Sequence, residues 1–125
     1  METVRIDSGD VTAIAFTGRL DAGTAAQAEE AVRAFLRQSD RGKLIIDLSG
    51  LDYISSAGLR VLIVAGKGVL QRGGRLALCG VRGNVREVLT VTGLGMLFDI
   101  AENRDQALGR LGPRASGAPG NPCGR

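Results

Sequence analysis

The sequence contains no histidine and no tryptophan, and aromatic residues make up only 3% of its 125 residues. Without an imidazole to act as a general base, hydrolase chemistry of the Ser-His-Asp kind is excluded. So few aromatic rings also argue against a stacking platform for single-stranded nucleic acid. The hydrophobic core must therefore be built from aliphatic side chains and alanine.

Cysteine and long apolar stretches are scarce as well. Cys79 falls within an apolar segment and is expected to be a small core residue, whereas the second cysteine, Cys123, lies near the C-terminus. Two cysteines in such different settings indicate neither a disulfide framework nor a metal site. The sequence also lacks a basic-then-apolar leader and an apolar run of about 18 residues. We therefore expect a soluble, cytoplasmic protein without a membrane partner.

The net charge of +3 has a local origin. Three of the 16 basic residues are Arg110, Arg114 and Arg125, and the basic residues that precede them balance the 13 acidic ones. A balanced domain with a thinly basic end is poor evidence for binding to nucleic acid or to an anionic membrane. Both kinds of partner are therefore excluded from the interpretation.

What the sequence does contain is an organising stretch, Leu44–Leu59. Its apolar start, interrupted only by Asp47, is typical of a strand that is covered on both faces. Its end, Ser55–Gly58, leads into apolar residues at helical spacing. These are Leu59, Leu62, Ile63, Gly66, Val69 and Leu70. The stretch predicts a buried strand that delivers two serines to a helix N-terminus, where free N–H groups favour an anion.

Local chemistry leaves two interpretations of Ser55 and Ser56 open. Either serine can be an ordinary N-cap, a role for which serine is strongly preferred. Alternatively, one hydroxyl is a phosphate acceptor, which needs only exposure and a partner kinase. A nucleophile elbow is excluded, because Ile54 stands where the G-x-S-x-G motif requires glycine.

Three charged residues have structural interpretations beside functional ones. Asp47 is placed at the end of the predicted strand, where we expect it to bond the loop backbone and orient the serines, not to bind a metal. Asp21 is expected either to cap the helix that follows it or to contact a partner. Arg60 points away from the predicted apolar stripe and is either a solvated surface charge or part of an interface.

The rest of the chain alternates between strand and helix patterns. In chain order, these patterns predict strands over Val4–Ile6 and Val11–Thr17 joined as a hairpin, a helix over Ala22–Gln38, a strand over Arg75–Cys79, a helix over Arg82–Val91, a short strand over Met96–Ile100 and a last helix from Asn103. Gly73–Gly74 and Gly93 are expected to end the helices before them. The alternation predicts an α/β fold in which helices pack on a sheet.

Two regions of different composition are predicted. Residues 1–111 form one domain, and residues 112–125, rich in glycine, proline and serine, are expected to be disordered.

The motifs resemble those of the STAS superfamily, most closely the small bacterial anti-sigma factor antagonists. The resemblance covers about residues 3 to 109 and is carried by G-R-L-D at Gly18–Asp21, D-L-S-G-L-D-Y-I-S-S-A-G-L-R-V-L at Asp47–Leu62, R-G-G-R-L-A-L-C-G-V at Arg72–Val81 and T-G-L-G-M-L-F at Thr92–Phe98. It implies a single STAS domain, with a small, mixed β-sheet flanked by about four α-helices.

The same resemblance implies a site. The phosphorylated serine of the family comes directly before the small residue and glycine at the helix start, which here are Ala57 and Gly58, so Ser56 is the expected acceptor. Many relatives have aspartate where this chain has Ser55. The implied partner-binding residues are Asp21, Ser55, Ser56, Ala57, Gly58 and Arg60.

The implied function is partner switching and not catalysis. The unphosphorylated protein binds an anti-sigma factor that is also a serine kinase, and phosphorylation of Ser56 ends the interaction until a serine phosphatase resets it. ATP belongs to the kinase, so no cofactor is expected in this chain. Three alternatives remain: a non-phosphorylated scaffold or adaptor in a larger signalling assembly, an accessory role in lipid transport, and an enzyme, which has only the serines in its favour and lacks a base.

Overall fold

The computed structural model describes residues 1–38 and 42–111. The tail predicted over residues 112–125, with Cys123, lies outside the described residues. The described elements are β1 (Glu2–Ser8), β2 (Val11–Leu20), α1 (Ala25–Gln38), β3 (Lys43–Ile54), α2 (Ser56–Gln71), β4 (Arg75–Cys79), α3 (Gly83–Thr92), the 3-10 helix η1 (Leu94–Leu97), β5 (Asp99–Ala101) and α4 (Arg104–Leu111).

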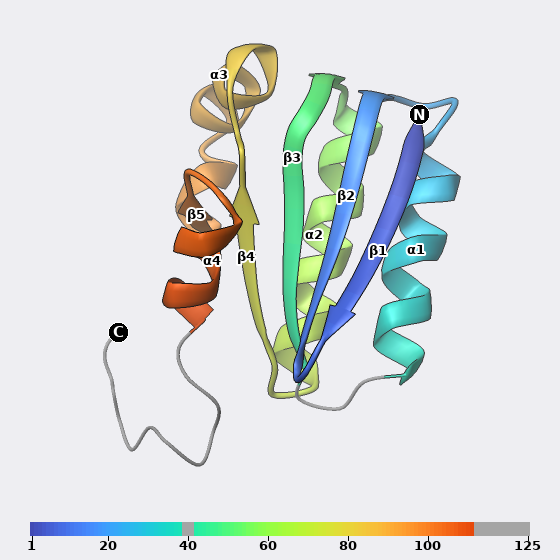
Figure 1. Cartoon of the computed structure of the whole chain (residues 1–125). Coiled ribbons are helices and arrows are strands. Elements are labelled where there is room, and N and C mark those ends of the chain that lie inside the picture. Colours follow the sequence, from blue (N-terminus) through green and yellow to red (C-terminus); the bar gives the residue numbers. More distant parts are fainter. Residues whose placement is uncertain (39–41, 112–125) are drawn as a thin grey trace.

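One mixed sheet organises the fold, with its strands in the order β1-β2-β3-β4-β5 (Figure 1). β1 is antiparallel to β2, and the remaining neighbours are parallel. The predicted hairpin at the sheet edge is confirmed: Ser8 pairs with Val11, and Gly9 turns the chain with a φ of 63°. The predicted fold class is confirmed as well.

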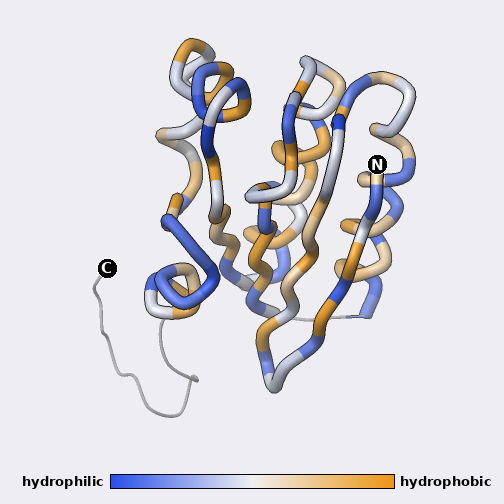
Figure 2. Tube along the Cα trace, turned by 45° about the horizontal axis from the view of Figure 1, so that its top comes forward, coloured by the Kyte–Doolittle hydropathy of each residue, from blue (hydrophilic) through white to orange (hydrophobic). Residues whose placement is uncertain are grey.

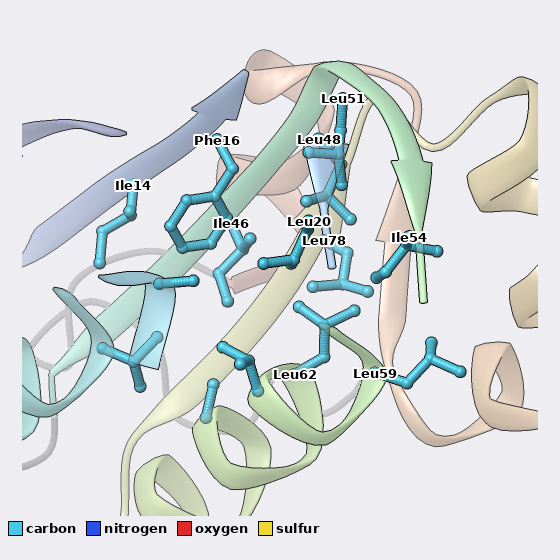
Figure 3. Packing of buried hydrophobic residues seen from close by; sticks show 14 of the residues in the cluster. Ile14, Phe16, Leu20, Ile46, Leu48, Leu51, Ile54, Leu59, Leu62 and Leu78 are labelled. Atoms are coloured by element: carbon cyan, nitrogen blue, oxygen red, sulfur yellow. The ribbon is translucent and has the colours of Figure 1, made fainter. Parts of the chain in front are cut away.

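β3 is covered on both faces, as its apolar sequence predicts. Ile45 and Ile46 are both buried although successive side chains of a strand point to opposite faces. On one face, Ile46 belongs to the large core that α1, α2 and α3 cover (Figure 3). On the other, Ile45 packs with Ala107 and Leu111 of α4. Hydrophobic residues accordingly concentrate along the middle strands (Figure 2).

The buried stripe of α2 differs from the predicted one. Leu70 was expected in the core and is 73% exposed, whereas Val61 and Ala65 are buried instead. Residues nine positions apart lie on opposite sides of a helix, so Val61 and Leu70 cannot share a face. The packing partner decides which side is buried: α2 also lies against α1, so closely that a Cβ on Gly68 would be 2.5 Å from Leu36 Cδ1.

Two element boundaries also require correction. The short strand predicted over Met96–Ile100 is present but begins later, because η1 occupies residues 94–97 and only Asp99–Ala101 joins the sheet. α1 begins at Ala25, not at residue 22, because residues 21–24 form a turn in which Asp21 O accepts the Thr24 and Ala25 N–H groups. The glycine stop at Gly93 is confirmed, with a φ of 76°.

The predicted cap of the last helix is confirmed. α4 follows Asn103, whose Oδ1 accepts the Gln106 N–H at 2.9 Å. Gln106 Oε1 reaches back to the Glu102 N–H at 3.0 Å, one residue before the position that a capping box would use.

Candidate functional site

The two serines lie at the junction between β3 and α2. β3 ends at Ile54, Ser55 occupies the N-cap position and Ser56 is the first residue of the helix. Two backbone hydrogen bonds fix the junction: the Ser55 N–H donates to Leu20 O, and Ser55 O accepts the Leu59 N–H, both at 2.9 Å. The sequence prediction of a strand that delivers serines to a helix start is therefore confirmed.

Gly58 lets the first turn of α2 sit directly on the sheet. A Cβ at this position would lie 2.7 Å from side-chain carbons of Leu20 and Ile54 and 2.8 Å from Leu20 O. No real Cβ packs so closely, so the position requires glycine for space. Figure 3 shows the buried side chains of Leu20, Ile54 and Leu59 in this part of the core.

The two hydroxyls have opposite environments. Ser56 is exposed, whereas the Ser55 Oγ is buried and has no hydrogen-bond partner within the described part of the chain. Ser55 makes no side-chain cap hydrogen bond. It therefore holds the N-cap position without the bond that makes serine a favoured cap. The N–H groups of the first turn of α2 therefore receive no side-chain cap from Ser55.

The end of β2 brings Asp21 next to the serines. β2 runs to Leu20, so the G-R-L-D motif is mostly strand and only Asp21 lies beyond it. β2 and β3 pair Leu20 with Ile54, and Leu20 O also accepts the Ser55 N–H, so Asp21 and Ser55 each follow one residue of this pair. Asp21 caps the turn that leads into α1, because its carbonyl accepts the Ala25 N–H at 2.8 Å. Its Oδ1 accepts the Gly23 N–H at 3.0 Å, and its N–H donates to Thr24 Oγ1 at 2.9 Å, which fixes the turn ahead of the helix.

Three residues near the β3–α2 junction were not singled out as site residues in the sequence: Arg19, Tyr53 and Asn84. Arg19 stacks on the Tyr53 ring at 4.2 Å from its centroid and lies 3.7 Å (Nε) from Asp21 Oδ2. Asn84 Oδ1, at the start of α3, accepts the Ile54 N–H at 3.2 Å. Arg19 and Tyr53 belong to motifs that were recognised, but only the β2–β3 register pairs them.

Of the other predicted site residues, Ala57 is half-buried and Arg60 is exposed in the first turns of α2. Asp21, Ser55, Ser56, Ala57, Gly58 and Arg60 thus all lie at or beside the β3–α2 junction. Asp47 does not. The prediction that it orients the serines is wrong, because β3 continues for seven residues beyond it.

The buried Asp47 carboxylate instead joins the exposed Ser49 and the half-buried Arg104 in a polar cluster. Its Oδ1 accepts the Ser49 N–H at 2.9 Å and the Ser49 hydroxyl at 2.7 Å. Burial by itself raises the pKa of Asp47, but the hydrogen bonds from Ser49 and Arg104 outweigh it and hold the pKa below its ordinary value. Burial, with the Asp47 charge, raises the pKa of the neighbouring Cys79 thiol to about 12. Cys79 is thus a core residue and not a thiolate nucleophile.

The described residues contain no group of three His, Cys, Asp or Glu side chains that could hold a metal ion. Within the same part of the chain, the helices are too short or too polar to cross a membrane.

Comparisons with known proteins agree on one family. The family model of the STAS domain matches residues 3–107. BtrV of Bordetella bronchiseptica, provisionally named an anti-sigma factor antagonist, is 40% identical over 84 residues, which cover 66% of this chain and 72% of BtrV. An anti-sigma F factor antagonist of Paenibacillus polymyxa is 27% identical over 101 residues, or 81% of this chain and 86% of the relative.

A solved structure extends the similarity to three dimensions. The crystal structure of an anti-sigma factor antagonist from Mycobacterium paratuberculosis superposes with a TM-score of 0.79 at 26% identity. The match covers 88% of this chain and 92% of the solved one.

Proposed function

The chain belongs to the STAS domain family, and on that premise we propose that it is an anti-sigma factor antagonist that works by partner switching. In its unphosphorylated form it binds an anti-sigma factor that is also a serine kinase, and the sigma factor is released. The kinase phosphorylates Ser56, after which the modified chain loses affinity for it. A separate serine phosphatase restores the unmodified form.

One observation carries this proposal: Ser56 is exposed at the first residue of α2, at a helix end whose N–H groups are not used by a cap. A phosphate on serine adds about −1.5 to −2 charges at neutral pH. Helix N-termini stabilise such a charge, so the domain can carry it without refolding.

The chemistry assigns the cofactor to the partner. The Ser56 oxygen attacks the γ-phosphorus of ATP held by the kinase, an O–P bond forms and ADP leaves with the bridging oxygen. The hydroxyl proton passes to a base of the kinase. In this cycle the chain is the substrate, and it requires neither a catalytic residue nor a nucleotide site of its own.

The switch requires an energy that a phosphate in an interface can supply. Reversing occupancy from about 99:1 to about 1:99 takes about 5.5 kcal/mol. A charge placed in a desolvated interface without a partner weakens binding by several kcal/mol. The same phosphate costs little in the free chain, where it faces water and the helix N-terminus. The energy therefore acts on binding and not on folding.

The test starts from the unmodified chain. It is used to isolate its binding partners from the cells that produce it, and the captured kinase is then supplied with ATP. We expect a mass increase of about 80 Da, the addition of one phosphate, and loss of kinase binding by the modified chain. A captured partner that neither modifies the chain nor releases it would favour the adaptor role in a signalling or lipid-transport assembly.

A further inference from the structure

Ser55 has a feature that the switching cycle does not explain. Its Oγ is buried and lacks a hydrogen-bond partner, the one such side-chain atom within residues 1–38 and 42–111. An unpaired buried hydroxyl destabilises a fold, and a native example calls for a reason. This one lies directly before the expected phosphate acceptor.

The geometry limits what Ser55 can do. Its N–H and its carbonyl are both held, at 2.9 Å each, by Leu20 and Leu59. The backbone cannot shift toward the sheet either, because Gly58 already allows the closest approach of α2 to Leu20. Rotation of the hydroxyl about the Cα–Cβ bond therefore remains as the local freedom of this residue.

A rotated hydroxyl would point toward the helix start, the region that an N-cap serine side chain normally serves. In the unmodified chain it makes no such bond, so the N–H groups of the first turn are not occupied by Ser55. A phosphate on the neighbouring Ser56 would introduce strong acceptor oxygens there. A hydroxyl bond to a charged oxygen is roughly twice as strong as one between neutral groups.

We propose that Ser55 is the positioning residue of the phosphorylated state, in which its hydroxyl leaves the buried position and donates a hydrogen bond to the phosphate on Ser56. This deepens the proposed function and rests on Ser56 as the acceptor. The unmodified chain keeps the hydroxyl unpaired, whereas the modified chain satisfies it. The hydrogen bond from Ser55 thus stabilises the phosphorylated chain relative to the unmodified one. The same bond holds the phosphate in one orientation.

The test uses chain in which phosphoserine is incorporated at position 56 during synthesis, so no kinase is involved. The second pKa of the phosphate is measured by 31P NMR. A donated hydrogen bond favours the dianion and lowers this pKa, so Ser55→Ala should raise it. Ser55→Cys, a weaker donor of similar size, should give an intermediate value. Ser8→Ala, an exposed serine in β1, is the matched control and should change nothing.

Charged groups around the site stay constant in these variants. They are Arg19 in β2, Asp21 beyond β2, Asp52 in β3, Arg60 in α2 and Arg82 before α3. Differences in the phosphate pKa therefore report the side chain at position 55.

Thermal unfolding of both forms separates positioning from a merely structural role. In the unmodified chain, Ser55→Ala removes an unpaired hydroxyl and should raise the melting temperature. In the phosphorylated chain, the same substitution removes a bond to the phosphate and should lower it. An unchanged phosphate pKa, or melting shifts of the same sign in both forms, would overturn the proposal. Neither readout depends on whether a kinase modifies Ser56, so a failure of the proposed function would be seen separately.

Discussion

Arg104 Nε lies 2.7 Å from Asp47 Oδ2, an ion pair between residues 57 positions apart that ties α4 to the middle strand of the sheet. Only 11% of the Asp47 side chain is exposed, compared with 40% for Arg104. The other carboxylate oxygen, Oδ1, accepts the N–H and the hydroxyl of Ser49. This polar cluster anchors α4 on the face of the sheet opposite α1 and α2.

Replacing Asp47 by asparagine should destabilise the domain. Asparagine would turn an N–H₂ group or an uncharged oxygen toward Arg104, and hydrogen bonds to charged groups contribute about 1.5–3 kcal/mol. We expect a loss of this order in the free energy of unfolding, measured in urea. Glu30→Gln is the matched control, because its ion pair with Arg37 is more than half exposed and should contribute at most about 1 kcal/mol. Equal effects of both substitutions would contradict the prediction.

The pH dependence of the same variant has a defined sign. The folded state lowers the pKa of Asp47, so the carboxylate adds stability above its unfolded pKa of about 4. That stability is lost as the pH falls through the folded pKa. The stability difference between the parent chain and Asp47→Asn should therefore shrink between about pH 5 and pH 2. The pKa of Asp7 is also lowered, chiefly by the Thr12 hydroxyl, but this contribution is common to both chains.

The identity of the phosphate acceptor can be tested by exchanging each serine for alanine. Ser56→Ala should abolish labelling by the kinase and retain binding, because the exposed hydroxyl is removed and the contact surface is nearly unchanged. Ser55→Ala should still be labelled, since its hydroxyl is buried. The measurement is phosphopeptide mapping by mass spectrometry. Labelling that persists in Ser56→Ala and disappears in Ser55→Ala would reverse the assignment.

Arg60 tests the position of the partner surface. It is exposed on α2 one turn beyond the serines. If the surface surrounds the β3–α2 junction, Arg60→Glu should weaken kinase binding by about tenfold or more, which corresponds to about 1.4 kcal/mol. Arg110→Glu makes the same charge change on α4 and should leave the affinity unaltered. The affinity of each variant for the kinase is measured by titration calorimetry. A change in affinity within about twofold for Arg60→Glu would place this residue outside the interface.

Gly58 should tolerate no side chain. The missing space for a Cβ predicts that Gly58→Ala costs about 1–3 kcal/mol and displaces the first turn of α2. Gly109→Ala is the control, because nothing lies within 4 Å of a Cβ there. In a helix with free space, alanine should instead stabilise by about 0.5–1 kcal/mol. Chemical denaturation of both variants measures the difference, and a harmless Gly58→Ala would show that α2 can move away from Leu20.

Much of the fold follows from local sequence. The apolar run before Ser55, the glycine at position 93 and the Asn103 cap each act through neighbouring residues, so their patterns predict the observed elements. The serine junction itself was predictable for the same reason. A strand pattern that ends in small residues and is followed by apolar residues at helical spacing predicts a strand that leads directly into a helix.

Tertiary structure decided the features that depend on distant residues. Asp47 was expected to orient the serine loop. No local pattern shows that β3 extends to Ile54 or that Arg104, far along the chain, forms an ion pair with the Asp47 carboxylate. The buried side of α2 depends on α1, which the stripe alone does not locate. The sequence by itself determined that two serines start a helix. Only the packing of that helix on Leu20 determined that Ser56 is exposed and the Ser55 hydroxyl is buried without a partner, because burial is set by neighbours in space.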